Sequence, residues 1–176
     1  GISYGGEISM LFALKYPDRT RSLIVSSAVS QIDTMLITMG TLWSSALRDR
    51  NADALFETSL PLNFSESWLK ANAGVLEATR SRYHQMDLAA AERLMQAFSV
   101  INFTDRLKDI NVPTQVLVGE LDILKPRKYA EIIASEIPGA ELVIIPRAGH
   151  AVSMEQPAAF NSAVMGFVLK HCEVVG

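Results

Sequence analysis

Three short apolar runs along the chain are the first feature that predicts a fold. They lie within residues 21–29, 115–118 and 142–145, are rich in β-branched side chains and do not alternate with polar positions. An unbroken apolar run of this length is typical of a strand covered on both faces, as in a parallel sheet. A proline or a Pro-Gly turn precedes the second and third runs, which gives each of those strands a defined start.

Helical patterns separate these predicted strands. Residues 7–16 are apolar on nearly every side and predict a buried helix that Pro17 stops. An amphipathic stretch at 129–137 follows Pro126, and apolar residues recur on one helical face after Pro157. The alternation of strand and helix predicts an α/β fold with right-handed crossovers between parallel strands.

The segment between the first two strands differs because it carries only helical patterns. Five helices are expected there, over residues 34–48, 52–59, 66–71, 74–83 and 88–100. An insert at this place in a parallel sheet would lie above the carboxyl ends of the strands, where α/β proteins bind ligands. We therefore expect a core made of residues 1–29 and 108–176, and a helical cap or lid made of residues 30–107.

Methionine and aromatic side chains of the insert are candidates for lining an apolar pocket, although most side chains of this kind pack helix against helix. The candidates are Met35, Met39, Trp43, Phe56, Trp68, Tyr83, Met95 and Phe98. The four that we single out as the substrate pocket are Met35, Met39, Trp43 and Met95.

Composition narrows the function classes. The chain has 176 residues, 49% of them apolar, which suffices for one domain with a sizeable core. A net charge of -3, with acidic residues among the basic ones, offers no cationic field for nucleic acid or acidic lipid. No apolar run approaches the ~20 residues that span a bilayer, so we expect no membrane partner and a cytoplasmic location. Cys172 is the only cysteine, which excludes an internal disulfide and a cysteine-based metal site.

The chemistry begins at Ser3, within Gly1-Ile2-Ser3-Tyr4-Gly5-Gly6. A strand-to-helix turn that exposes a serine hydroxyl needs small neighbours, because bulkier side chains would collide with the adjacent strand and helix. Gly1 and Gly5 fill those places, and Gly6 adds room for the helix to approach the sheet. The helix that follows leaves backbone N–H groups unpaired at its start, so the N–H of Tyr4 is the candidate donor to an oxyanion.

Asp122 and His150 each follow a predicted strand. Together with Ser3 they are candidates for an acid, a base and a nucleophile that act on one substrate. Asp122 lies in Val118-Gly119-Glu120-Leu121-Asp122, where it could orient a histidine; Glu120 is expected to point to the other side. His150 follows Gly149, and histidine can accept and return a proton near neutral pH. The other two histidines lack such a context and are expected to be structural or surface residues.

Ser3, Asp122 and His150 stand in the chain order Ser, Asp, His, which is that of the α/β-hydrolases. From Gly1 to Lys170 the chain resembles the C-terminal portion of an α/β-hydrolase fold enzyme of the serine esterase and lactonase kind. Residues 1–6 match the nucleophile elbow, 118–122 the acid loop and 149–157 the histidine loop. The resemblance implies a partial α/β-hydrolase fold in which these three residues are nucleophile, acid and base, with no metal and no organic cofactor. Glu155 and Pro157 resemble the family's structural start to the last helix.

The same resemblance implies a serine hydrolase that cleaves a small-molecule carboxylic ester, lactone or thioester through an acyl-enzyme. A serine nucleophile argues against the dehalogenase and epoxide hydrolase branches, which use an aspartate there. Three alternatives stay open: a carbon-carbon bond hydrolase, an acyltransferase, and a non-catalytic relative that acts as a ligand sensor or interaction protein.

Members of the family that this chain resembles carry about five strands before the nucleophile elbow. They also carry, in that part of the chain, a loop that supplies a second oxyanion donor. We therefore expect this chain to be a piece of a polypeptide of about 260 to 280 residues. The strand at 21–29 would present an unpaired edge, which favours association with the N-terminal half of the fold or with a second copy. Alone, the chain is expected to have little hydrolase activity.

Overall fold

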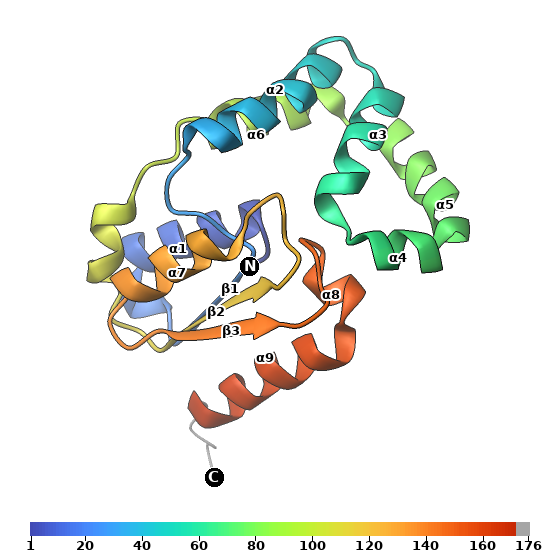
Figure 1. Cartoon of the computed structure of the whole chain (residues 1–176). Helices are drawn as coiled ribbons and strands as arrows, with labels where there is room; N and C mark the ends of the chain where they lie inside the picture. Colours follow the sequence, from blue (N-terminus) through green and yellow to red (C-terminus); the bar gives the residue numbers. More distant parts are fainter. Residues whose placement is uncertain (172–176) are drawn as a thin grey trace.

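The computed structural model describes residues 1–171 as a parallel sheet of three strands with helices packed around it (Figure 1). The strands β1 (Leu23–Ser26), β2 (Thr114–Gly119) and β3 (Glu141–Ile145) lie side by side in that order. In the register, Val25 pairs with Val116, and Leu117 with Val143. The α/β fold class and the three parallel strands are therefore confirmed. Cys172, the only cysteine of the sequence, lies outside the described residues.

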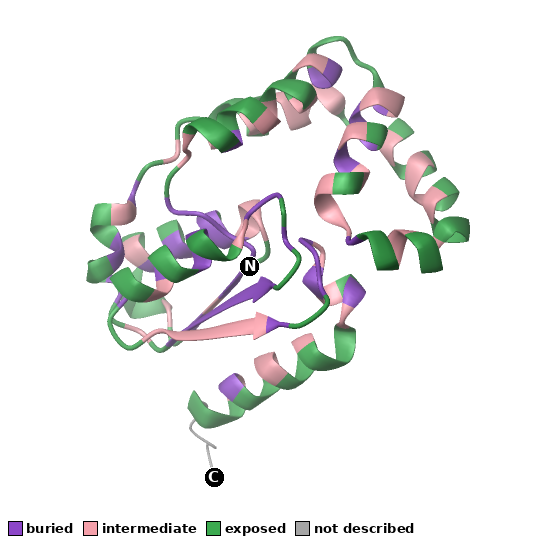
Figure 2. Cartoon of the chain, viewed as in Figure 1, coloured by how far each residue is buried: buried purple, intermediate pink, exposed green. Residues whose placement is uncertain are grey.

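Burial differs from strand to strand across the sheet. Every residue of β2 is buried, as expected for a central strand between two neighbours (Figure 2). In β3 only Ile145 is buried and the other residues are half-buried, because β3 has one paired neighbour in the described part of the chain. Complete cover on both faces, predicted for all three strands, therefore holds for β2 and is wrong for β3.

Helices cover both faces of the sheet (Figure 1). On one face, α1 (Tyr4–Lys15) and α7 (Arg127–Glu136) pack on β1 and β2 around Met10, Val25 and Ile133. On the other face, α9 (Pro157–His171) packs through Phe160 and Val164 against Leu117 of β2. The remaining short elements of this core are η1 (Pro17–Arg19), η2 (Thr104–Asp109) and α8 (Val152–Glu155).

The first helix is buried on one side only. Glu7, Met10 and Ala13 face the sheet and are buried, whereas Leu11 and Phe12 are exposed. The prediction of a helix buried on nearly every side is therefore wrong for the described residues, in which no element covers the outer face of α1. An apolar pattern shows which side chains of a helix can be buried, but which of them are buried depends on the elements that pack against the helix.

The insert between β1 and β2 is entirely helical, as predicted. Its helices are α2 (Thr34–Arg48), α3 (Ala52–Asn63), α4 (Glu66–Ala71), α5 (Ala73–His84) and α6 (Leu88–Phe98). Four of them begin after a residue whose side-chain oxygen accepts a backbone N–H of the first turn, which fixes their starts. These caps are Asp33, Asn51, Ser65 and Asp87. The assignment of residues 30–107 as a cap over a substrate stays a prediction.

The insert leaves and rejoins the core at adjacent points. Gln31 and Asn102 form an antiparallel bridge, and the amide of Phe103 donates to the carbonyl of Ser30 at 2.9 Å. The amide of Ile32 donates to the carbonyl of Ile101 at 3.0 Å. The two connecting segments are thus paired with each other by backbone hydrogen bonds.

The predicted open edge of β1 is partly covered by the start of the chain. Ile2 pairs with Ser26 in parallel, and the amino group of Gly1 donates to the carbonyl of Ile24 at 2.7 Å. The amide of Ser26 donates to the carbonyl of Gly1 at 2.9 Å, and that of Ser3 to the carbonyl of Ser26 at 2.8 Å. Residues 1–3 therefore act as a short neighbouring strand at the carboxyl end of β1.

Asp33 joins the first helix of the insert to the core. Its Oδ1 accepts the Leu36 amide of α2 at 3.0 Å, and its Oδ2 accepts the Tyr129 hydroxyl at 2.7 Å and Lys128 Nζ at 2.9 Å. Burial acts to raise the pKa of Asp33, but the hydrogen bonds from Leu36, Tyr129 and Lys128 outweigh it and lower the pKa to about 2.

We expect Asp33→Asn to lower the stability of the protein near neutral pH and to do so less at acid pH. The folded pKa lies below the ordinary value of 3.8, so the stabilisation is complete above that value and is lost as the pH falls toward 2. Both partners of the Lys128 ion pair are more than a third exposed, which keeps the effect to about 1 kcal/mol or less. Urea unfolding at pH 7, 5 and 3 measures it, and a difference between parent and variant that does not change with pH would contradict the assignment.

Candidate active site

Ser3 has a backbone conformation that is strained for a residue with a side chain. Its φ is 52°, and α1 begins at the next residue. Such a conformation costs of order 1–3 kcal/mol and persists only where its surroundings enforce it. Here Ser3 donates its amide to Ser26, and its carbonyl accepts the amide of Gly6 at 2.7 Å. The local geometry is that of the strained strand-to-helix turn expected from the motif.

Two of the three glycines around Ser3 are required by close packing. A Cβ on Gly1 would lie 2.1 Å from the carbonyl oxygen of Gly5, and one on Gly6 would lie 2.7 Å from the Cβ of Ala28. A Cβ on Gly5 would meet no described atom within 4 Å. The expected collision of a side chain is therefore confirmed at Gly1 and wrong at Gly5, and Gly6 gives α1 room to approach the sheet, as predicted.

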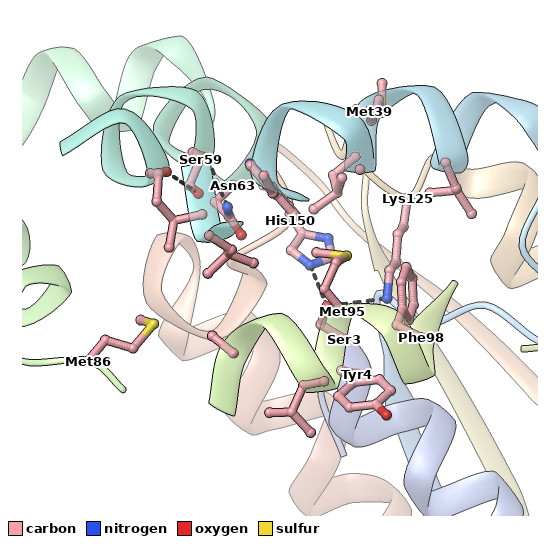
Figure 3. Close-up of a pocket in the computed structure, with 18 of the residues that line it drawn as sticks. Ser3, Tyr4, Met39, Ser59, Asn63, Met86, Met95, Phe98, Lys125 and His150 are labelled. Atoms are coloured by element: carbon pink, nitrogen blue, oxygen red, sulfur yellow. Dashed lines mark hydrogen bonds between the residues drawn. The ribbon is translucent and has the colours of Figure 1, made fainter. Parts of the chain in front are cut away.

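The three residues singled out from the sequence lie in one chain of hydrogen bonds. His150 Nε2 lies 2.9 Å from Ser3 Oγ, and His150 Nδ1 lies 2.9 Å from Asp122 Oδ2 (Figure 3 shows the first contact). Asp122 follows β2, His150 follows β3, and Ser3 sits beside the end of β1. Asp122 and His150 are each only 4% exposed, so the acid is buried together with the base that it orients.

The loop that carries His150 is fixed from several sides. Glu120 accepts the amide of Arg147 at 2.9 Å, whereas the carboxylate that contacts His150 is that of Asp122. The carbonyl of His150 accepts the Ser27 hydroxyl at 3.3 Å. Gly149 has no room for a side chain, because its Cβ would lie 2.7 Å from Glu155 Oε1.

Glu155 ties this loop to the insert. Its buried carboxylate accepts the Ser65 amide at 3.2 Å and also the Ser65 hydroxyl, at the start of α4. The amide of Ala151 donates to the carbonyl of Asn63 at the end of α3, at 2.8 Å. Glu155 therefore connects the histidine loop with the insert, in addition to its place at the end of α8.

A buried ion pair that sequence reasoning missed lies directly beside Ser3. Lys125 Nζ is 2.8 Å from Glu7 Oε1 and 3.3 Å from Ser3 Oγ. The side chains of Lys125 and Glu7 are 3% and 0% exposed. Glu7 Oε1 also accepts the amide of Val29 at 2.8 Å, and the amide of Lys125 donates to Asp122 Oδ1 at 2.8 Å.

Burial and pairing act in opposite directions on these two charges. Loss of hydration raises the pKa of the Glu7 carboxyl and lowers the pKa of the Lys125 ammonium, and their mutual attraction opposes both shifts. Lys125 Nζ and Glu7 Oε1 lie 2.8 Å apart, the distance of a charge-assisted hydrogen bond, and we therefore assign the pair as carboxylate and ammonium. Glu7 Oε2 is buried without a hydrogen-bond partner among residues 1–171.

A cavity of about 320 Å³ opens above Ser3 and His150. Most of its wall is apolar and comes from the insert, including Met39, Trp43 and Met95 as predicted (Figure 3 labels Met39 and Met95). Met35 is 56% exposed and does not line it, so that prediction is wrong. One residue along a helix is a rotation of about 100°, and it is Leu36 that faces inward. Further lining residues include Tyr83, Leu94 and Phe98.

Tyr4 lies at the floor of this cavity, where α1 begins. As the first residue of the helix, its N–H has no acceptor within the helix. Its ring meets the ring of Phe98 edge to face, with centroids 5.7 Å apart, which joins the insert to the floor of the cavity. The candidate oxyanion donor is thus present beside Ser3.

The remaining histidines lie away from this site. His84 is half exposed and lies 3.2 Å from Asp53 in the insert, and His171 lies 3.5 Å from Glu141. Residues 1–171 contain no cluster of three or more histidine, cysteine, aspartate or glutamate side chains suited to a metal ion. In the same residues, no helix combines the length and the apolar character that crossing a membrane requires.

A parallel sheet that carries a serine at a strained strand-to-helix turn, with an acid and a histidine after the next two strands, defines an α/β-hydrolase. A family model described as "Serine aminopeptidase, S33" matches residues 1–157, and the chain belongs to this family of α/β-hydrolases.

Comparison with known proteins gives relatives of modest identity. The chain is 28% identical over 172 residues to a protein of Caulobacter sp. (strain K31) named "Putative carbamate hydrolase RutD", and the match covers 96% of this chain and 63% of that protein. It is 25% identical over 191 residues to the proline iminopeptidase of Thermoplasma volcanium, covering 97% of this chain and 64% of the relative. The chain therefore spans less than two thirds of the length of these curated relatives.

Solved structures show the same fold. An alpha/beta hydrolase enzyme, MGS-M2, from a Medee basin deep-sea metagenome library superposes with a TM-score of 0.90 at 26% identity, over all of this chain and 66% of that one. A thermophilic esterase from Thermogutta terrifontis gives a TM-score of 0.84 at 26% identity, over 97% of this chain and 64% of that one. The predicted resemblance to α/β-hydrolases is thus confirmed.

We expect Gly6→Ala to destabilise the protein by about 1–3 kcal/mol, because the new methyl group would press on Ala28 and push α1 from β1. Gly74→Ala in α5 is the matched control, since a Cβ there meets nothing within 4 Å and alanine favours a helix. Chemical denaturation of both variants measures the difference. Equal stability of the two variants would mean that the contact between α1 and β1 is looser than the structure shows.

Proposed function

We propose that the protein is a serine hydrolase that cleaves a small-molecule carboxylic ester, lactone or thioester through an acyl-enzyme. The observation that carries the proposal is the continuous chain of hydrogen bonds from Ser3 Oγ through His150 to Asp122, at the floor of an apolar cavity. The names of the relatives, which include a carbamate hydrolase and an esterase, support hydrolysis of a carbonyl compound.

Acylation in this proposal uses the three residues in separate roles. His150 Nε2 accepts the hydroxyl proton of Ser3 while Oγ bonds to the carbonyl carbon of the substrate. The negative charge that forms on the carbonyl oxygen is stabilised by the N–H of Tyr4. As the bond to the leaving group breaks, His150 gives that proton to the leaving oxygen or sulfur, and Asp122 stabilises the imidazolium in between.

Deacylation repeats these steps with water as the nucleophile. His150 takes a proton from the water, the hydroxide oxygen bonds to the acyl carbon, and the bond to Ser3 Oγ breaks. Oγ recovers its proton from His150, and the carboxylic acid leaves. Every proton and bond is accounted for without a metal or an organic cofactor.

The cavity indicates the substrate class. Its volume of about 320 Å³ and its wall of Met, Leu, Trp and Phe side chains suit a small, largely apolar acyl group. Its polar groups are few. Ser3, Lys125 and His150 gather at the floor, and the buried indole N–H of Trp43 has no acceptor in the described part of the chain. Ser59 and Asn63 of α3 also line the cavity, and both donate to backbone carbonyls of their own helix. A substrate with one carbonyl group near an apolar body fits this distribution.

In the complete polypeptide to which this chain is expected to belong, Ser3→Ala, and separately His150→Ala, should lower kcat/KM for p-nitrophenyl esters by about 1,000-fold or more, because each removes a group that the others need. Short acyl esters such as the acetate and butyrate are the first substrates to test. Ser135→Ala, at an exposed serine of α7, is the control and should leave turnover unchanged.

A fluorophosphonate probe gives an independent measurement. It should label the parent and the Ser135→Ala variant and fail to label Ser3→Ala. Labelling that persists in Ser3→Ala, or ester turnover equal to that of the parent, would contradict the proposal. Binding of ligands without any turnover that depends on Ser3 would favour a non-catalytic role.

A further inference from the structure

The floor of the cavity holds a buried cation for which the three-residue mechanism has no use. We propose that Lys125 is a further catalytic residue, whose ammonium donates a hydrogen bond to Ser3 Oγ and stabilises negative charge on that oxygen during acylation and deacylation. The inference rests on the proposed function, since it assigns a role within the same reaction.

Ser3 Oγ lies between two nitrogen atoms from different loops. His150 Nε2 is 2.9 Å away and Lys125 Nζ is 3.3 Å away (Figure 3). A hydroxyl group has one proton to donate and lone pairs that accept. Ser3 can therefore donate to His150 and accept from Lys125 at the same time, and this arrangement aims its proton at the histidine.

Two neighbours hold the ammonium in place and oppose the loss of its charge. Glu7 supplies a carboxylate oxygen 2.8 Å from Nζ, and the ring centroid of Phe98 lies 4.8 Å from Nζ. A carboxylate and an aromatic face are both favourable neighbours of a cation. With 3% exposure there is little water to replace these contacts.

The two nitrogens near Oγ have different tasks. His150 is closer to Oγ and is oriented by Asp122, so it accepts the proton, whereas Lys125 keeps all three of its protons throughout. When the Ser3 proton moves to His150, negative charge grows on Oγ, and the hydrogen bond from the cation strengthens. The same applies in deacylation, when Oγ leaves the acyl carbon and carries charge until His150 returns the proton.

The cost of burying the pair argues that it serves more than stability. Removing two charges from water is expensive, and apolar side chains of similar volume often stabilise a core as well or better. Glu7 Oε2 is also left without a hydrogen-bond partner in the described residues. A costly pair that contacts both the serine and, through the Lys125 amide, Asp122 is typical of a functional site.

Lys125 also lines the cavity, so a competing role is to bind a carboxylate on the substrate. The geometry favours contact with Ser3, because Glu7 already neutralises the cation. The two roles differ in a measurable way. Stabilising Oγ changes kcat for every substrate, whereas anchoring a carboxylate changes KM for anionic substrates alone.

The test is Lys125→Met, assayed with a neutral and a carboxylate-bearing p-nitrophenyl ester of equal chain length. We expect kcat to fall about 10- to 100-fold with both esters, and KM to change by less than about 3-fold. Lys128→Met, three residues along the chain at an exposed lysine, is the matched control and should keep the parent kcat.

Lys125→Met leaves the buried Glu7 carboxylate without its partner, and this unpaired charge could unfold the variant. A second variant is therefore needed. Glu7→Gln/Lys125→Met removes both charges and leaves a neutral pair, so it should fold and show the same loss of kcat. Thermal unfolding confirms that each variant is folded. In Glu7→Gln alone the cation stays beside Ser3, and kcat should exceed that of the double variant.

Each outcome decides between the roles. A kcat within about 2-fold of the parent in the folded double variant overturns the assignment, and so does a rise in KM confined to the carboxylate ester. Ser3→Ala, assayed in parallel, separates this inference from the proposed function. These assays use the complete polypeptide, because the chain alone is expected to have little activity. If the complete parent shows no turnover that depends on Ser3, the proposed function fails. If the complete parent shows such turnover and the kcat of Lys125→Met equals it, only the role of Lys125 fails.

Discussion

Parallel pairing of β1, β2 and β3 is the constraint on which the site depends. Because the strands run in the same direction, their carboxyl ends meet at one edge of the sheet. Asp122 follows β2, His150 follows β3, and Ser3 is bonded to the last residue of β1. A change of register between any two strands would move these side chains apart by several ångströms, so the hydrogen bonds of the sheet set the distances at the site.

The charged side chains at the site contact one another and form one connected group. Lys125 contacts Glu7 through its ammonium and Asp122 through its amide, and Asp122 contacts His150. Two carboxylates and one ammonium group therefore surround the serine and histidine within a mostly apolar shell. In such a shell each charge acts more strongly than it would in water, and the placement of one affects all the others.

The sequence was sufficient to find the strands, the helices of the insert, and Ser3, Asp122 and His150, because each follows a local pattern. Glu7 and Lys125 were missed because 118 residues separate them and only the packing of α1 against the acid loop joins them. Met35 was misplaced because an apolar pattern does not fix the rotation of α2 to within one residue. The exposed face of α1 was misjudged because burial depends on neighbours that a helical pattern cannot name.

The paired connections at Gln31 and Asn102 have a consequence for how this protein could diversify. Since the chain leaves and rejoins the core at one point, the insert behaves as a branch whose length does not alter the spacing of the strands. Helices could be gained, lost or replaced there while the strands keep their spacing, provided that Asn63 and Ser65 still bind the loop of His150. Under the proposed function, changes of the insert that keep these two contacts would alter the cavity and leave the spacing of the three strands unchanged.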